Sequence, residues 1–230
     1  FHKKNNKGEE NETMKKILAL VLVLIMALGL AACAAPAAPA EEPTPAAEPE
    51  TEKVDSQAIL AELKTPAEEG NWERTTSSQE VIDFLKVVAE HSAGRIILDT
   101  TTFATEAGTP IPYMIISDVA PASPADVPED KGVVYVNCNI HSGEIEGKES
   151  MMIFAREVAQ GKHDDLLKDL VVIIVPNSNP DGNDNLGKNR ITTQFTPKLV
   201  GTRAEGNGLN VNRDMTKLET ACGRTIVKLM

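Results

Sequence analysis

The sequence predicts an α/β fold in which a mixed, largely parallel β-sheet is flanked by helices. Two short apolar runs, 132–140 and 170–175, are rich in β-branched residues and have the length of strands. They alternate with segments whose apolar residues recur at helical spacing, which is typical of a sheet covered by helices on both faces. The 230 residues suffice for one medium-sized domain preceded by shorter segments.

Two helices are expected before the first strand. Residues 55–64 are expected to form a short helix. A longer helix is predicted to begin at Ser77, because Ser77 and Glu80 have the Ser-x-x-Glu spacing of a capping box. Gly94 is expected to end this helix. Its apolar residues recur at helical spacing: Val81, Phe84, Leu85 and Val88.

A β-hairpin is predicted next. Arg95–Phe103 and Ile111–Ser117 are β-branched runs, and the segment 106–110 between them contains the Gly and Pro that are typical of a turn. After a Pro-rich loop, residues 132–140 are expected to form a buried strand. A helix over residues 147–160 follows it.

The last part of the chain is predicted to hold a strand at 170–175 and a helix from about Lys217 to the end. In sheets of this class, ligands bind at loops that follow the carboxyl ends of strands. A functional site is therefore expected just after residues 140 and 175.

The beginning of the sequence has the pattern of an export signal. Residues 1–13 are polar and are expected to be upstream sequence read through in frame, because Met14 with its two following lysines is a better start. The apolar run 17–30 is a signal-peptide core that is too short for an ordinary membrane span. Residues 14–32 are therefore predicted to be a signal peptide.

The apolar run leads through Leu-Ala-Ala into Cys33, which resembles the lipoprotein box of bacteria. This resemblance implies that Cys33 is lipidated, and that the protein is anchored on the extracytoplasmic face of the cell membrane. A plain signal peptide or a short anchor helix is the alternative. Residues 33–54 are mostly Ala, Pro, Glu and Thr and are expected to be an extended, disordered linker. The folded domain is assigned to 55–230.

Charge and cysteine content exclude two classes of protein. Lys and Arg number 23 against 34 Asp and Glu, a formal net charge of −11. Nucleic acid is therefore not an expected partner, because phosphate binding needs clusters of Lys and Arg. Three cysteines are too few for a disulfide scaffold. Cys138 is expected to be a buried thiol, and its pairing with Cys222 stays open.

Three polar clusters follow the predicted strands. His141 and Glu144 stand where a strand opens into a loop, and an imidazole with a carboxylate suits zinc. Alone this pattern is weak, because a surface His near a Glu is common. The second cluster, Asn-Pro-Asp-Gly at 179–182, is also good turn chemistry. The third contains Asn212 and Arg213, and such a pair can bind a carboxylate.

In this order the three clusters resemble the zinc carboxypeptidases, the carboxypeptidase A-like metallopeptidases. The flanking segments Gly143–Glu149 and Leu209–Asp214 resemble an exported bacterial branch of that family. The resemblance covers about residues 75–230. It implies a zinc-dependent metallocarboxypeptidase that removes the C-terminal residue of peptides or cell-wall peptides.

The resemblance also implies roles for single residues. His141 and Glu144 match the first two zinc ligands of the family. Asn212 and Arg213 match the pair that binds the terminal carboxylate of the substrate. The family uses a further Arg, upstream of that pair, to stabilise the oxyanion. Arg203 is expected to be this residue, and Arg190 is the alternative.

Two departures from the family pattern are visible. Asn210 stands where the family usually has Asp. The family's third zinc ligand, a later His, and its general-base Glu have no counterpart here, because His91 and His163 lie at predicted helix ends. The chain is therefore expected to be the N-terminal part of the family's domain, without activity of its own.

Two other functions remain open. A deacylase related to aspartoacylase and succinylglutamate desuccinylase would have the same His-x-x-Glu and Asn-Arg patterns. A non-catalytic binding lipoprotein would keep the fold without the chemistry. Export, the membrane anchor and the Asn-Pro-Asp-Gly segment favour the peptidase.

Overall fold

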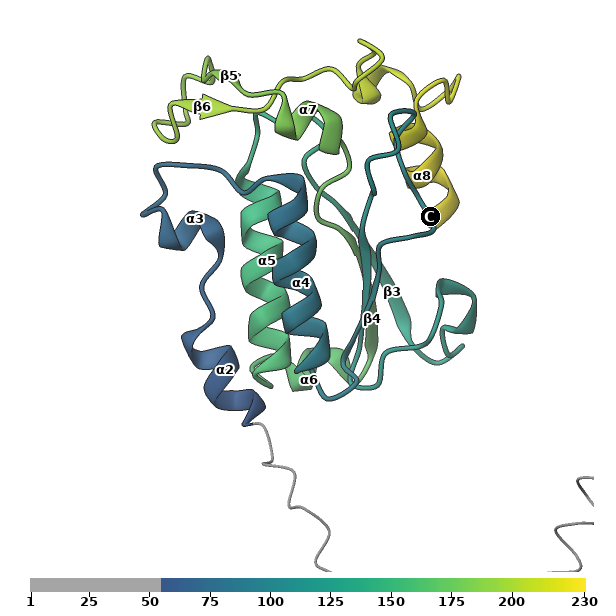
Figure 1. Ribbon diagram of the computed structural model, residues 1–230. Helices are drawn as coiled ribbons and strands as arrows, with labels where there is room; N and C mark the ends of the chain where they lie inside the picture. Colours follow the sequence, from purple (N-terminus) through teal and green to yellow (C-terminus); the bar gives the residue numbers. More distant parts are fainter. Residues whose placement is uncertain (1–54) are drawn as a thin grey trace, which may run out of the picture. The chain divides into compact units, whose positions relative to one another are not determined.

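The computed structural model describes residues 55–230, in which a four-stranded sheet has helices on both of its faces (Figure 1). The strand order is β1-β2-β4-β3. The strands are β1 (Ile96–Asp99), β2 (Tyr113–Ile116), β3 (Gly132–Asn137) and β4 (Leu170–Val175). The predicted signal peptide, the lipidation site Cys33 and the linker lie outside the described residues.

The prediction of a mixed α/β fold is confirmed, but parallel pairing does not dominate within residues 55–230. Only β3 and β4 pair in parallel, whereas β1 with β2 and β2 with β4 pair antiparallel. Residues 100–112 join β1 to β2 and reverse the chain at a turn closed by the isolated Ala104–Pro110 bridge, which brings the two strands together antiparallel. The crossover between β3 and β4 is the helix α5 (Glu146–Ala159).

Helices α4 (Ser78–Glu90) and α5 cover one face of the sheet (Figure 1). Met114 of β2 and Ile174 of β4 are neighbours in the register and point into this core, as do Phe84 and Met152 from the helices. Shorter helices adjoin the pair: α2 (Ser56–Glu62), α3 (Pro66–Glu69) and α6 (Asp164–Leu167). Within residues 55–230, no helix is both long and apolar enough to cross a membrane.

The predicted start of α4 is confirmed. The Ser77 hydroxyl accepts from the Glu80 N–H, and the Glu80 carboxylate accepts from the Ser77 N–H at 2.9 Å, which is a complete capping box. The helix ends at Glu90, before Gly94, and Gly94 has a φ of 81° in the turn that follows.

Helix α8 (Ala221–Leu229) covers the opposite face of the sheet (Figure 1). Ile115 and Ile173 point toward it, because side chains alternate between the two faces of a strand. This helix begins four residues later than predicted. Its N-cap is Thr220, whose side chain accepts from the Gly223 N–H, and the Asp214 carboxylate in turn accepts from the Thr220 N–H and hydroxyl.

The prediction that residues 132–140 form a buried strand is wrong in two respects. Among the strands of residues 55–230, β3 lies at the edge of the sheet, and Val133 is 55% exposed. The strand also ends at Asn137, because Asn139 has a φ of 59° and turns the chain out of the sheet. An apolar run indicates a strand, but it does not give the position of that strand in the sheet.

Loops and short elements gather beyond the carboxyl ends of β3 and β4 (Figure 1). These two ends lie side by side, since Asn137 pairs with Val175 in the register. The short elements are α7 (Pro180–Asp184), η2 (Val211–Arg213) and a two-stranded ribbon of β5 (Gly187–Lys188) and β6 (Leu199–Val200). A further short element, η1 (Pro124–Asp126), precedes β3. The polar clusters therefore lie beyond the same end of the sheet, as the sequence predicts.

Candidate metal and substrate site

His141 and Glu144 lie together in the loop between β3 and α5. His141 Nδ1 is 3.1 Å from Glu144 Oε1. The Glu144 N–H donates to the His141 carbonyl at 2.8 Å, which closes a turn between the two residues. His141 is buried, whereas the Glu144 side chain is half-exposed. The Ser142 hydroxyl anchors the loop by donating to the Asn179 carbonyl at 2.7 Å.

The two side chains fit part of a zinc site. Zinc binds an imidazole nitrogen and a carboxylate oxygen at about 2.0–2.2 Å, so two such donors on one ion lie roughly 3–3.5 Å apart. The 3.1 Å separation of His141 Nδ1 and Glu144 Oε1 agrees with this requirement. The described residues therefore present two donors that suit the metal implied by the sequence.

Both predicted arginines line the same cavity as His141 and Glu144, and its volume is about 490 Å³. Arg203 Nη1 is 2.8 Å from His141 Nε2, and Arg203 Nη2 is 3.6 Å from Glu144 Oε1. Arg190 makes no side-chain hydrogen bond or ion pair within the described part of the chain. The remaining wall comes from the ribbon and the segments around it: Gly143, Gly187, Lys188, Ile191, Val200, Gly201 and Thr202.

Asn210 connects His141 with the predicted carboxylate-binding pair. Asn210 Oδ1 is 3.1 Å from His141 Nε2 and accepts from the Asn212 backbone N–H at 3.0 Å. Asn212 and Arg213 are exposed on η2 and do not line the His141 cavity. The Arg213 guanidinium donates to the Asn212 carbonyl at 2.6 Å. The structure thus links the pair to His141 through Asn210, without direct contact.

The two neighbours of His141 Nε2 favour different tautomers. A proton on Nε2 lets it donate to Asn210 Oδ1 and leaves a lone pair on Nδ1, which is the form that binds a metal through Nδ1. A proton on Nδ1 lets Nε2 accept from the Arg203 guanidinium instead. A cation placed between His141 and Glu144 would select the first form.

The other described histidines lie elsewhere. His91 Nδ1 is 3.0 Å from the Ser56 hydroxyl, and His163 Nε2 is 3.1 Å from Glu157 Oε2. Within residues 55–230, no group of three or more His, Cys, Asp or Glu side chains could hold a metal. A catalytic zinc site usually has three protein ligands and a water, and the described residues supply two.

A buried charged network beneath the site loop was not identified from the sequence. Lys148 is fully buried on α5, with its Nζ 3.4 Å from Glu149 Oε1. Burial lowers the pKa of Lys148, and the Glu149 carboxylate opposes that shift. A signal was present, because Lys148 stands four residues before Met152 and seven before Ala155, on the apolar face of the helix.

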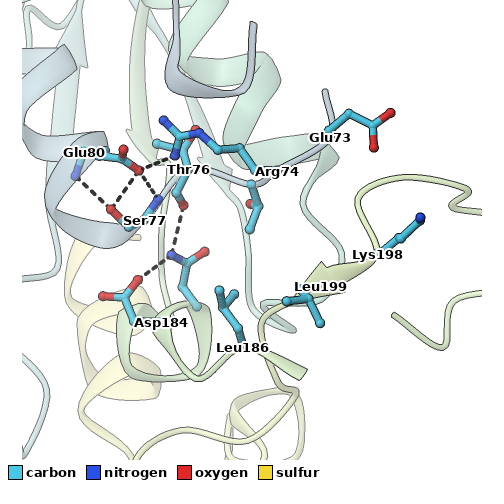
Figure 2. Close-up of a pocket in the computed structure, with 11 residues that line it drawn as sticks. Glu73, Arg74, Thr76, Ser77, Glu80, Asp184, Leu186, Lys198 and Leu199 are labelled. Carbon is cyan, nitrogen blue, oxygen red and sulfur yellow. Dashed lines mark hydrogen bonds and ion pairs between the residues drawn. The ribbon is translucent and has the colours of Figure 1, made fainter. Parts of the chain in front are cut away.

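A second cavity, of about 440 Å³, adjoins this network (Figure 2). Thr76 and Asn183 line it, and Asn183 Nδ2 donates to the Thr76 carbonyl at 3.1 Å. The Arg74–Glu80 ion pair, at 2.9 Å, also lines this cavity (Figure 2). This cavity contains no histidine, so the His141 cavity is the candidate metal site.

Cys138 and Cys222 do not form a disulfide. Both are free and buried. Burial raises the pKa of the Cys138 thiol to about 11. Burial and the neighbouring Glu205 carboxylate also raise the pKa of Cys222. Of the two possibilities that the sequence left open, the structure shows unpaired thiols.

Comparison with solved structures finds carboxypeptidases. A metallo-carboxypeptidase from Burkholderia cenocepacia is 19% identical with a TM-score of 0.47, and the match covers 67% of this chain and 37% of that one. Carboxypeptidase A from Helicoverpa armigera is 16% identical with a TM-score of 0.44, covering 74% and 46%. This chain therefore spans less than half the length of these structures. No curated protein sequence matches it.

A family model described as zinc carboxypeptidase matches residues 83–222. The match includes the His-x-x-Glu loop, the Asn-Pro-Asp-Gly segment and the Asn-Arg pair, and it covers more than half of the chain. The chain belongs to the zinc carboxypeptidase family.

Proposed function

We propose that this chain supplies part of the active site of a zinc-dependent metallocarboxypeptidase that hydrolyses the C-terminal residue of peptides. The observation that carries the proposal is the 3.1 Å approach of His141 Nδ1 to Glu144 Oε1 in a cavity that Arg203 also lines. Membership of the zinc carboxypeptidase family supports the same reading.

Each residue has a defined part in this proposal. His141 and Glu144 would hold the zinc, and a zinc ion bound there would supply a water of lowered pKa and polarise the scissile carbonyl. Arg203 donates hydrogen bonds to the oxyanion that develops at this carbonyl. Its contacts with His141 and Glu144 favour it over Arg190 for this role.

The substrate carboxylate is assigned to Asn212 and Arg213. A guanidinium can bind a carboxylate through two parallel hydrogen bonds, and an exposed Arg is open to an entering peptide. The Arg213 guanidinium donates to the carbonyl of Asn212, which keeps it beside that residue. A substrate with a free C-terminus would bind here, and a peptide amide would bind poorly.

The location is also part of the proposal. The Leu-Ala-Ala-Cys33 pattern supports a lipid anchor on the extracytoplasmic face of the cell membrane, with peptides or cell-wall peptides as substrates. Replacement Cys33→Ala is expected to release the protein from the membrane fraction. Retention of the variant in that fraction would contradict the anchor.

The test of the proposed peptidase activity uses the protein purified from the cells that make it. Zinc-dependent cleavage of a blocked dipeptide with a free carboxylate, lost in His141→Ala, is the expected result. Cleavage of an acyl-amino acid in place of the dipeptide would identify a deacylase. Zinc or peptide binding without cleavage of either substrate would identify a binding protein.

A further inference from the structure

We propose that Lys148 and Asn183 are positioning residues, and that the Asn183 side-chain oxygen fastens together the two ends of the loop that carries His141 and Glu144. The functional part of this inference rests on the proposed metal site. Its structural part rests on contacts between described residues and can be tested without a metal.

Both ends of the loop meet at one acceptor atom. Asn183 Oδ1 accepts from Lys148 Nζ at 2.6 Å and from Asn139 Nδ2 at 3.0 Å. Asn139 stands two residues before His141, and Lys148 stands four residues after Glu144. One amide oxygen on α7 therefore fixes the separation between the start and the end of the loop.

The two ends also touch directly. A Cβ on Gly147 would lie 3.1 Å from the Cβ of Cys138 and 3.2 Å from its Sγ, which is closer than most side-chain contacts allow. The first turn of α5 thus packs against the residue that follows β3. With both ends fixed, the loop has little freedom to change the direction of His141 and Glu144.

Asn139 is held in an unusual conformation at the entry to the loop. Its φ of 59° lies in the left-handed region, which few residues other than glycine adopt and which Asn tolerates better than most. Asn139 is buried, and its Nδ2 donates to Asn177 Oδ1 at 2.8 Å as well as to Asn183. These bonds hold the turn that aims His141 away from the strand.

Lys148 is anchored on the opposite side of the network. Its Nζ donates to Thr75 Oγ1 at 2.8 Å and to the Thr76 carbonyl, so its three donors are used when Asn183 is included. The Glu149 carboxylate accepts from the Thr75 hydroxyl at 2.9 Å and from the Thr76 N–H at 2.8 Å.

A gain in stability alone does not explain a buried ion pair. A well-packed apolar side chain at a buried ion-pair position is often as stable or more stable than the pair. The Lys148 ammonium group instead adds hydrogen bonds that fix α5 relative to α7 and to the segment before α4. These contacts support a role in positioning the site loop.

The test compares two substitutions of one residue. Asn183→Ala removes the shared acceptor, whereas Asn183→Asp keeps an oxygen for Lys148 and Asn139. The aspartate also replaces the Nδ2 donor with a second acceptor that faces the Thr76 carbonyl and Asp184 Oδ1. Val158→Ala is the control, because Val158 is fully buried at the far end of α5, the helix that carries Lys148. Asn139→Gly is a further variant that keeps the left-handed turn but removes its side-chain anchor.

The readout is the imidazole signal of His141 in long-range proton–nitrogen NMR spectra of the metal-free protein. Asn183→Ala and Asn139→Gly should shift or broaden the His141 signal, while the signals of His91 and His163 stay in place. Asn183→Asp keeps the shared acceptor and should shift the His141 signal less than Asn183→Ala does. Val158→Ala should lower the Tm without shifting the His141 signal.

The inference is overturned if the His141 signal is unchanged in Asn183→Ala and Asn139→Gly, or if Val158→Ala moves it equally. Should Asn183→Ala fail to fold, Asn139→Gly decides the question. With zinc added, Asn183→Ala should bind about tenfold more weakly than the wild type, the size expected for a residue behind the ligands. Absence of zinc binding in the wild type would contradict the proposed function, and the NMR signals would still decide the positioning role.

Discussion

His141 Nε2 lies 3.1 Å from the side-chain oxygen of Asn210, so the ring nitrogen opposite the candidate metal position faces a neutral amide. Metal-binding histidines usually donate this second N–H to a carboxylate, a carbonyl or a water, which fixes the ring and makes it more basic. A neutral acceptor orients the ring as well as a carboxylate does, but it raises the basicity of the ring less.

Asn210→Asp is therefore expected to bind zinc more tightly than the wild type, by roughly tenfold, the lower end of the range for such partners. Isothermal titration of zinc into the two proteins measures the difference. Asn207→Asp is the control, because it adds the same charge in the same loop, where the Asn207 side chain only accepts from the Leu209 N–H. Equal gains in both variants would show that charge alone is responsible.

Gly147→Ala is expected to destabilise the protein by about 1–3 kcal/mol, the usual cost of overpacking. In most helices this change is stabilising, but here the new Cβ would lie 3.1 Å from the Cβ of Cys138. Urea unfolding measures the change. Gly187→Ala is the control, because a Cβ there would meet no atom within 4 Å. A stabilised Gly147→Ala variant would contradict the close contact between the loop ends.

The capping box of α4 predicts a pH-dependent contribution to stability. Hydrogen bonding from Arg74, followed by bonds from Ser77, lowers the pKa of Glu80 to about 2 from 4.5. A carboxyl whose pKa is lowered by folding stabilises the protein above the unfolded pKa, and this stabilisation is lost as pH falls toward the folded pKa. Glu80→Gln should therefore lower the Tm at pH 7 and have almost no effect at pH 2.

Glu90→Gln provides the control for this prediction. Glu90 is exposed at the end of the same helix and has no side-chain partner within the described residues. Its substitution should leave the pH dependence of the Tm close to that of the wild type. The capping account fails if the two variants follow the same curve between pH 2 and pH 7.

The thiols of Cys138 and Cys222 are expected to be unreactive in the folded protein. Both are buried, and burial raises the pKa of each, so little thiolate is present near neutral pH. In a Cys33→Ala variant, a disulfide-exchange reagent at pH 8 should label no thiol quickly and two after denaturation. Rapid labelling of either thiol in the folded protein would contradict the burial.

Local patterns in the sequence were sufficient for most of the fold. The capping box at Ser77 and Glu80 predicted the start of α4, and the apolar run 170–175 predicted β4 with the bounds that the structure shows. The exposed edge position of β3 was not predictable, because the order of strands depends on contacts between distant segments. The late start of α8 depends on Asp214, which bonds Thr220 only once the loop between them has folded.

The arrangement of the candidate site was also predictable only where it depends on local sequence patterns. The spacing of His141 and Glu144 placed both in one loop, and the structure brings Arg203 to them. The positions of Arg203 and Arg190 around the cavity depend on the paths of the ribbon and of the loop that follows it, which local sequence patterns do not give. The role of Asn183 as a shared acceptor needed the contact between α7 and α5, which lie 35 residues apart at this point.

The most direct test of the account is a zinc titration that compares the wild type with variants of the described histidines. We predict one zinc per chain at the His141 cavity, with binding lost in His141→Ala, weakened in Glu144→Gln and unchanged in His163→Ala. The imidazole signal of His141 should move during the titration while those of His91 and His163 do not. Zinc binding by His141→Ala that equals that of the wild type would contradict the assignment of this loop as the metal site.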